Sequence, residues 1–209
     1  DVRETPIERV TATGIKTSNK DYEFDYIVYA TGFDAVLGAF NRIDFRGVGG
    51  VSLKDKWVDG PRTFLGMQVA GFPNMFTLVG PHNAATFCNI PRCIEQNVEW
   101  VTDLFRHMQA EGLTNVAATK EAEDEWTEHV HETSERMLFT KVDSWFTGIN
   151  PNLKGRDTRK FLLYAAGAPK YNEMCDEVAA NGYKGLTFSA FSRSISFCWF
   201  FWFFDHCWR

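Results

Sequence analysis

The sequence predicts an α/β protein, in which short strands end at glycine turns and amphipathic helices follow. Two apolar runs, residues 26–30 and 75–79, lead directly into turns at Gly32 and Gly80. Runs of four or five apolar residues are typical of strands buried inside a sheet. Three later segments repeat their apolar residues at helical spacing. Buried strands followed by such helices are the pattern of a layered α/β fold.

Further strands are expected on either side of these runs. Residues 7–10 and 15–17 flank a turn that ends at Gly14, a pattern that favours a small hairpin. Residues 62–67 and 161–164 are further apolar runs of strand length. Between residues 36 and 61 the chain is rich in glycine and mixed in pattern, which indicates loops and short strands.

The first helix is expected to begin after residue 89 and to stop at residue 112. Asn89 is a suitable N-cap, Pro91 falls in the first turn where no N–H is needed, and Gly112 is a typical helix stop. Its apolar residues recur at intervals of three and four, and we expect them to form the buried face: Ile94, Val98, Val101, Phe105 and Met108.

Two more helices are expected, near residues 119–137 and 169–181. The second helix begins near Thr119, and its acidic run, residues 121–128, is interpreted as a solvated face. The third helix ends before Gly182. The side chains expected to face inward from these two helices are Ala122, Trp126, Val130, Met137, Tyr171, Met174, Cys175 and Val178.

Composition excludes several classes of function. The 209 residues have a formal net charge of -5, which disfavours a nucleic-acid partner. Histidines and cysteines do not converge at ligand spacing, so no metal site is expected. The five cysteines include no CxxC pair, and we interpret all of them as reduced thiols of a cytoplasmic protein: Cys88, Cys93, Cys175, Cys198 and Cys207.

The carboxyl-terminal segment differs from the rest of the chain. Residues 195–204 are almost wholly apolar and aromatic, but this run is far shorter than the roughly 20 residues that cross a bilayer as a helix. An interfacial anchor would need a basic face, which this run lacks. We therefore interpret residues 189–209 as an atypical aromatic tail and expect no membrane partner.

Three segments are candidates for binding chemistry. Gly32 permits close backbone approach to a ligand at a sheet edge, although an ordinary strand-ending turn explains it equally well. Residues 80–91 precede a long helix whose free N–H groups suit an anion or a carbonyl oxygen; taken alone, a capped helix with a long lead-in is the simpler explanation. Trp145 offers a flat stacking face, but a lone tryptophan more often packs in a core.

Taken together, the segments resemble the carboxyl-terminal part of Baeyer–Villiger monooxygenases, which are class B flavoprotein monooxygenases of the cyclohexanone and phenylacetone type. The resemblance covers nearly all of residues 1–188 and is carried by residues 25–34 (DYIVYATGFD), 60–63 (GPRT), 71–74 (GFPN), 80–81 (GP), 94–100 (IEQNVEW), 123–126 (EDEW), 144–150 (SWFTGIN) and 177–185 (EVAANGYKG). It implies the carboxyl-terminal part of a flavoprotein with two dinucleotide-binding domains, for FAD and NAD(P), and with a helical segment.

The resemblance also implies a function and a division of the chain. NADPH would reduce FAD, which would then insert one oxygen atom of O2 into a small-molecule ketone to give an ester or lactone. Residues 1–30 would end the NADP-binding domain, and residues 31–188 would be the returning half of the FAD-binding domain with its helical cap. Alternatives are a flavin-containing monooxygenase that oxidises nitrogen or sulfur, or an inactive truncated product.

Residue roles follow from the same resemblance. Thr31 and Gly32 would lie at the return from the NADP domain, Asn89 and Ile90 beside the flavin ring, and Trp145 against NADP. The substrate pocket would include His82, Asn83, Phe87 and Phe146. The family's two GxGxxG loops, its FxGxxxHxxxW fingerprint and its active-site arginine have no counterpart in this sequence. No catalytic residue is therefore assigned, and we expect the chain by itself to bind FAD weakly or not at all.

Overall fold

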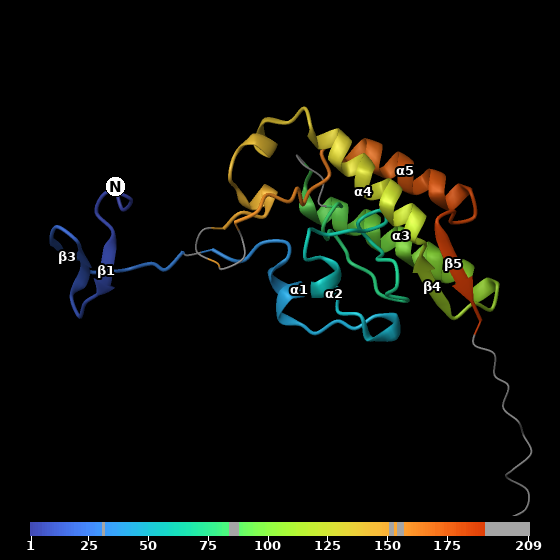
Figure 1. Ribbon diagram of the computed structural model, residues 1–209, viewed down its shortest axis with the longest axis horizontal. Helices are drawn as coiled ribbons and strands as arrows, with labels where there is room; N and C mark the ends of the chain where they lie inside the picture. The colour runs from blue at the N-terminus through green and yellow to red at the C-terminus, as the bar shows by residue number, and fades with distance from the viewer. Residues whose placement is uncertain (31, 84–87, 151–152, 154–156, 191–209) are drawn as a thin grey trace, which may run out of the picture. The chain divides into compact units, whose positions relative to one another are not determined.

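The chain forms two compact units, which are described separately. The computed structural model describes residues 1–30, 32–83, 88–150, 153 and 157–190 (Figure 1). The first unit is Asp1–Phe33 and the second is Asp34–Arg209.

The first unit is a three-stranded antiparallel sheet in the order β1-β2-β3. Strand β1 (Ile7–Val10) pairs with β2 (Gly14–Thr17), as the expected hairpin requires. The third strand, β3 (Asp21–Glu23), was not expected, because its sequence is polar; it pairs with β2, and Ile15 lies opposite Tyr22.

The expected strand at residues 26–30 is not formed. These residues have no strand assignment, and Tyr26 is 90% and Val28 86% exposed. An apolar run becomes a buried strand only if neighbouring strands accept its backbone hydrogen bonds and cover its faces. No other described segment of the chain pairs with it. The prediction was therefore wrong for this chain, although the apolar pattern still marks a surface suited to burial.

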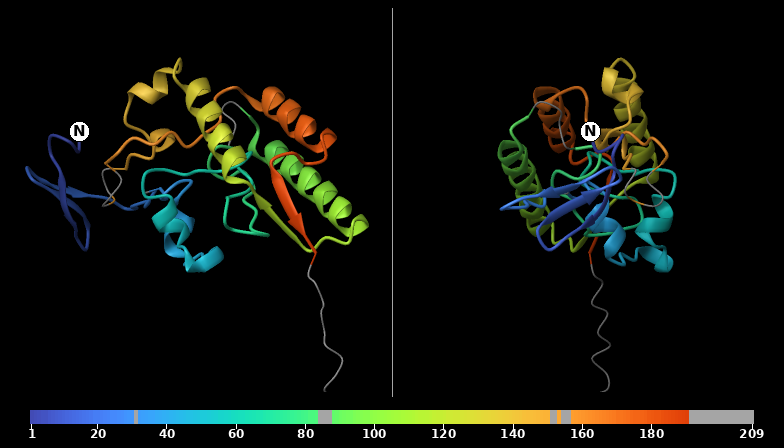
Figure 2. Two further views of the ribbon diagram at one scale, coloured as in Figure 1. Left: turned by 45° about the vertical axis from the view of Figure 1, so that its right-hand side comes forward. Right: turned by 90° about the vertical axis from the view of Figure 1, so that its left-hand side faces the viewer.

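Three long helices dominate the second unit, and all three expected helices are present. They are α3 (Ile90–Ala110), α4 (Lys120–Ser134) and α5 (Ala168–Ala180) (Figures 1 and 2). Their ends follow local sequence signals. The Thr119 hydroxyl accepts from the Ala122 N–H at 3.1 Å at the start of α4, and Gly112 and Gly182 lie at positive φ just beyond α3 and α5.

Smaller elements complete this unit. Helices α1 (Gly38–Arg42) and α2 (Leu53–Lys56) and a 3-10 turn (Val48–Gly50) occupy the glycine-rich region where loops and short strands were expected. Strands β4 (Asn115–Ala118) and β5 (Leu186–Ser189) pair antiparallel and were not anticipated. Two further 3-10 turns are Leu138–Lys141 and Trp145–Thr147.

The three remaining expected strands are not formed. Residues 75–79 form no bridge, Phe64 makes an isolated bridge to Gln68 around a turn at residues 65–67, and within 161–164 only Tyr164 makes an isolated bridge. Many of these residues are nevertheless buried, including Leu65, Thr77 and Leu162. Apolar runs of this length predict burial reliably, but they do not specify which segment will supply the backbone partner. Here side chains and single backbone contacts replace a sheet.

The buried face of α3 is rotated from the expected one. Val101 and Met108 are buried as expected, but Ile94, Val98 and Phe105 are 40%, 44% and 49% exposed. The helix instead buries Cys93, Asn97, Trp100 and Leu104 against the other helices. Asn97 lies on this buried face although it is polar, so the apolar pattern in the sequence did not indicate the face. Helix α3 therefore has an apolar stripe that no described part of the chain covers fully.

The acidic run of α4 is not a uniformly solvated face. Glu123 is 1% exposed, and its carboxylate accepts a hydrogen bond from Lys56 Nζ at 2.9 Å and another from the Ala70 N–H at 2.8 Å. The ion pair joins α4 to α2, and the amide contact joins α4 to the loop before Gly71. The expectation failed at this residue because the partners are distant in sequence.

Replacing Glu123 with alanine should destabilise the protein strongly. The change leaves Lys56 and the Ala70 N–H without their buried acceptor, and breaking a buried pair in this way costs about 3 kcal/mol. The matched control is Glu128→Ala, since Glu128 is exposed on the same helix. Urea denaturation of both variants would measure the difference. Equal stability of the two variants would contradict a structural role for the Glu123 ion pair.

Candidate functional site

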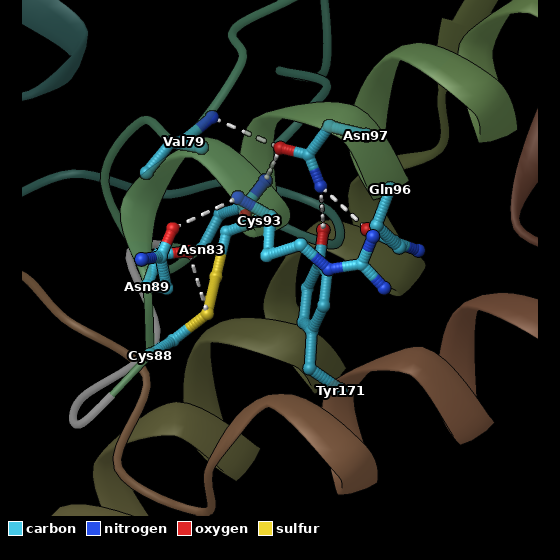
Figure 3. The surroundings of a disulfide bond; sticks show 9 residues. Val79, Asn83, Cys88, Asn89, Cys93, Gln96, Asn97 and Tyr171 are labelled. Carbon is cyan, nitrogen blue, oxygen red and sulfur yellow. Dashed lines mark hydrogen bonds between the residues drawn. A yellow bond between two sulfur atoms is a disulfide. The ribbon is translucent and has the colours of Figure 1, made fainter.

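A buried amide holds together the loop before α3, the helix itself and α5 (Figure 3). Asn97 is fully buried. Its Oδ1 accepts from the Val79 N–H at 2.9 Å and from Asn83 Nδ2 at 2.6 Å. Its Nδ2 donates to Gln96 Oε1 at 2.7 Å and to the Tyr171 hydroxyl at 3.4 Å. The position of Asn83, an expected pocket residue, is therefore fixed by a residue that the sequence analysis had not singled out.

The same network continues into the core. The Tyr171 hydroxyl donates to the Leu65 carbonyl at 2.8 Å, and burial raises the pKa of this phenol well above its ordinary value. At Gly66, next to Leu65, φ is +64°, and a Cβ there would meet the Asn83 side chain at 2.3 Å. Only glycine satisfies both the left-handed backbone and this close approach. Asn83 is thus contacted both by Asn97 of α3 and by the backbone turn at Gly66.

His82 is a buried, neutral imidazole in this loop. Its side chain is fully buried, Nδ1 lies 3.3 Å from the Thr63 hydroxyl, and its ring stands 6.1 Å from that of His131. Burial lowers the pKa of His82 to about 3, with a smaller contribution from His131. The imidazole of His82 is therefore neutral near neutral pH. His82 therefore acts in this structure as a packed structural residue.

Leu162 connects His82 to the segment that carries Trp145 and Phe146. Its carbonyl accepts from the His82 N–H at 2.9 Å, and its own N–H donates to the Phe146 carbonyl at 3.0 Å. The structure thus connects two expected pocket residues, 64 positions apart in sequence, through the backbone of Leu162. Phe146 lies 4.1 Å from Trp145, ring centre to ring centre, and Trp145 is 52% exposed. An exposed indole face is available for stacking.

The amino end of α3 presents an available donor. Asn89 Oδ1 accepts from the Arg92 N–H at 3.4 Å, which confirms Asn89 as the N-cap. Pro91 has no N–H, so Ile90 carries the remaining free amide at the first two helical positions. Ile90 is 46% exposed. This amide, together with the dipole of a 21-residue helix, favours a carbonyl oxygen or an anion.

The cysteines are not all reduced, in contrast to the expectation. Cys88 and Cys93 form a disulfide across the amino end of α3 (Figure 3), while Cys175 is a buried free thiol. Cys88 immediately precedes the N-cap and Cys93 is the fourth helical residue. These two positions commonly touch at a capped helix start. The capped helix start at Asn89 therefore brings Cys88 and Cys93 together, although their spacing is not that of a CxxC pair.

The other expected site residues are placed as follows. Gly32 has φ +79°, a conformation that favours glycine, and belongs to the first unit. Thr31 and Phe87 lie outside the described residues. In the second unit, hydrogen bonds through Leu162 connect His82 to Phe146 of the 3-10 turn Trp145–Thr147. Asn83 is bound to Asn97 of α3, and Asn89 and Ile90 form the amino end of that helix. Their assignments to flavin, NADP and substrate stay predictions.

The described residues offer two further observations on the type of protein. No group of three or more metal-ligating side chains occurs among them. Within the same residues, no helix combines the length and apolar character that crossing a membrane requires.

Comparison with known proteins identifies similar sequences, although no family model matches the chain. It is 45% identical over 186 residues to 2-oxo-Δ3-4,5,5-trimethylcyclopentenylacetyl-CoA monooxygenase of Pseudomonas putida, covering 89% of this chain and 34% of that protein. It is 40% identical over 184 residues to phenazine N-monooxygenase PhzNO1 of Lysobacter antibioticus, covering 88% of this chain and 33% of that protein. Baeyer–Villiger, cyclopentanone and cyclohexanone monooxygenases match at 36–38% identity.

Solved structures show the same correspondence in three dimensions. The crystal structure of OTEMO in complex with FAD and NADP has a TM-score of 0.80 and 43% identity, covering 90% of this chain and 34% of that one. The chain therefore spans about a third of the length of the proteins that it matches. The chain contains both helices and strands and matches part of the flavoprotein monooxygenase fold. This agrees with the fold class expected from the sequence.

The stability of the protein should depend on pH through His82. Its pKa is about 3 when folded, below the ordinary value of 6.5, so the unfolded chain binds the proton first as pH falls. Stability from this group is fully present above pH 6.5 and is lost progressively down to the folded pKa of about 3. Between pH 6.5 and 4.5 the free energy of unfolding should fall by about 2 kcal/mol on this account.

The comparison that isolates this effect is His82→Asn. Asparagine tolerates the positive φ of residue 82, which is 66°, and does not titrate. Urea denaturation at several pH values should show a shallower acid decline for the variant. Parallel declines for the two proteins would show that His82 is not the group responsible.

Proposed function

We propose that this chain, which belongs by sequence and fold with the Baeyer–Villiger monooxygenases, forms part of an enzyme that uses FAD and NADPH to insert one oxygen atom of O2 into a small-molecule ketone. The observation that carries the proposal is the match of 90% of the chain, at 43% identity and a TM-score of 0.80, to a monooxygenase crystallised with FAD and NADP. Because the chain spans about a third of that protein, the activity is proposed for the longer flavoprotein.

The local chemistry of the α3 amino end supports a flavin contact. Bound FAD, once reduced by NADPH, would supply the oxygen chemistry, and the protein would bind and orient it. Reduced flavin carries negative charge near its pyrimidine ring. The free Ile90 amide and the positive end of the α3 dipole are complementary to that charge. Asn89 is committed to capping, so its proposed role is to fix the direction in which the Ile90 amide points.

The Trp145–Phe146 pair supports a contact with the nicotinamide cofactor and substrate. Trp145 is half-exposed, and its ring is tilted by 33° against that of Phe146, so the exposed part of the indole is proposed to take a planar ring. Phe146 is anchored through Leu162 to the His82 loop. We propose that Trp145 contacts NADP and that Phe146, His82 and Asn83 shape one wall of the pocket, His82 and Asn83 by packing alone because both are buried.

The exposed apolar surfaces support the view that further protein covers this chain. Residues 26–30 resemble a buried strand but are exposed, and Ile94 and Val98 leave an apolar stripe on α3. Exposed apolar clusters of this kind mark surfaces that pack against other protein. The phosphate-binding glycine loops that FAD and NADPH require are likewise absent from these 209 residues.

We also propose a cytoplasmic location, where NADPH is available as the reductant.

Oxidation of a nitrogen heterocycle is the second candidate function. The similarity to phenazine N-monooxygenase PhzNO1, at 40% identity over 184 residues, specifically favours it. Ketone and nitrogen oxidation need the same cofactors, so the cofactor contacts of this chain do not discriminate between them. The substrate decides, and only product analysis separates the two reactions.

A chimera tests the proposed function directly. Residues 1–188 would replace the matching third of the Pseudomonas putida relative, and the product would be purified and supplied with NADPH. We expect stoichiometric yellow flavin and conversion of a cyclic ketone to a lactone, detected by mass spectrometry. Conversion of phenazine but not of the ketone would favour the second candidate. A folded chimera that binds no FAD would overturn both.

In the same chimera, Trp145→Ala should weaken NADPH binding. Loss of one stacking face should raise the KM for NADPH about fivefold while changing kcat little, because one aromatic stacking contact is worth about 1 kcal/mol. The matched control is Leu138→Ala, which removes a side chain that is 77% exposed in the neighbouring turn. An unchanged KM in the Trp145 variant would remove this residue from the NADP site.

A further inference from the structure

The Cys88–Cys93 disulfide occupies a position that helix geometry makes favourable for contact. At a helix start capped by asparagine, the residue before the cap and the fourth helical residue face each other, and apolar side chains at these positions often pack together. In this chain the cap is Asn89, and the two facing positions are Cys88 and Cys93, which are covalently joined. The capped start that Asn89 specifies therefore brings the two cysteines to neighbouring positions.

We propose that this disulfide is a reversible redox switch that controls how firmly the first turn of α3 is held. In the oxidised form, residues 88–93 are a closed covalent ring that contains Asn89 and Ile90. In the reduced form, the ring opens, and the turn keeps its hydrogen bonds from the Arg92 N–H to the Asn89 side chain and from the Cys93 N–H to the Asn89 carbonyl. The consequence for FAD rests on the function proposed above: reduction would loosen the Ile90 amide and lower the affinity for the flavin.

The surroundings of the bond allow a small thiol to reach it. Both cysteines line an open cavity of about 460 Å³ between the amino ends of α3 and α5, together with Arg92, Gln96, Pro169 and Tyr171. Cys88 is half-buried, whereas the free thiol of Cys175 is fully buried and has a pKa raised to about 12 by burial. Access therefore distinguishes the disulfide from the remaining described cysteine, which is inert by comparison.

The chemistry is thiol–disulfide exchange with glutathione as the named co-reactant. A glutathione thiolate attacks Cys88 Sγ, the Cys88–Cys93 bond breaks, and Cys93 leaves as a thiolate at the amino end of α3, where a helix stabilises negative charge. A second glutathione thiolate then releases Cys88. Two protein thiols and one glutathione disulfide result, and the two protons come from the two glutathione thiols. The reverse reaction restores the bond.

Peptide mapping tests whether the bond is reversible. The 209-residue chain would be equilibrated with oxidised or with reduced glutathione, its free thiols alkylated, and the protein digested with trypsin. Cleavage after Arg62, Arg92 and Arg106 separates Cys88 from Cys93, in peptides 63–92 and 93–106. We expect these two peptides to be linked after oxidised glutathione and separate after reduced glutathione. Absence of the link under both conditions, or its persistence under both, would overturn the switch.

Hydrogen exchange tests whether the bond controls the helix start. Amides of residues 92–96 should exchange roughly tenfold faster in the reduced protein, because opening a short covalent ring makes local fraying easier. Cys88→Ser/Cys93→Ser should exchange at the fast rate in both buffers, and Cys175→Ala should retain the response. Equal exchange in oxidised and reduced wild-type protein would overturn control of the turn, even if the bond itself is reversible.

These measurements are independent of flavin binding. Both measurements use the chain without cofactor. A negative result would therefore overturn the redox switch whichever substrate the enzyme oxidises. Conversely, a chimera that binds no FAD would overturn the proposed function without affecting the measured reversibility of the Cys88–Cys93 disulfide.

Discussion

The arrangement of the candidate site depends on one buried side chain, Asn97. Its amide satisfies the backbone at Val79, the side chain of Asn83 and, through Tyr171, the third helix of the core. An unsatisfied amide at a fully buried position would cost about 2 kcal/mol, so these groups hold one another in a single arrangement. Residues 79 and 83 are consequently held against Asn97, in the amino-terminal half of α3.

Sequence reasoning succeeded where structure is determined locally. The start of α3 at Asn89, the start of α4 at Thr119 and the stops at Gly112 and Gly182 all follow from hydrogen bonds or backbone angles within a few residues. It failed where a distant partner decides the outcome. Residues 75–79 are apolar like a strand, yet no described neighbour pairs with them, and an apolar run carries no information about that neighbour.

The same distinction between local and distant partners applies to the candidate site. Asn89, as the cap, could be found from its neighbours alone, whereas Leu162 could not, because its role lies in two backbone hydrogen bonds to His82 and Phe146. Asn97 was passed over because polar residues within an amphipathic pattern are normally assigned to solvent. Its burial was detectable only through the complementary donors at Val79 and Asn83, which are 18 and 14 residues away.

The apolar stripe of α3 connects the structural and functional arguments. Ile90, Ile94 and Val98 recur at intervals of four, so they form one line along the helix, and all three are at least 40% exposed. The line begins at the residue whose free amide is proposed to face the flavin. A longer flavoprotein that covered this stripe would bury the amino end of α3 as well, excluding water from the Ile90 donor. In a drier site that donor would interact more strongly with the charge of a reduced flavin, so burial of the stripe and binding of the cofactor should reinforce each other.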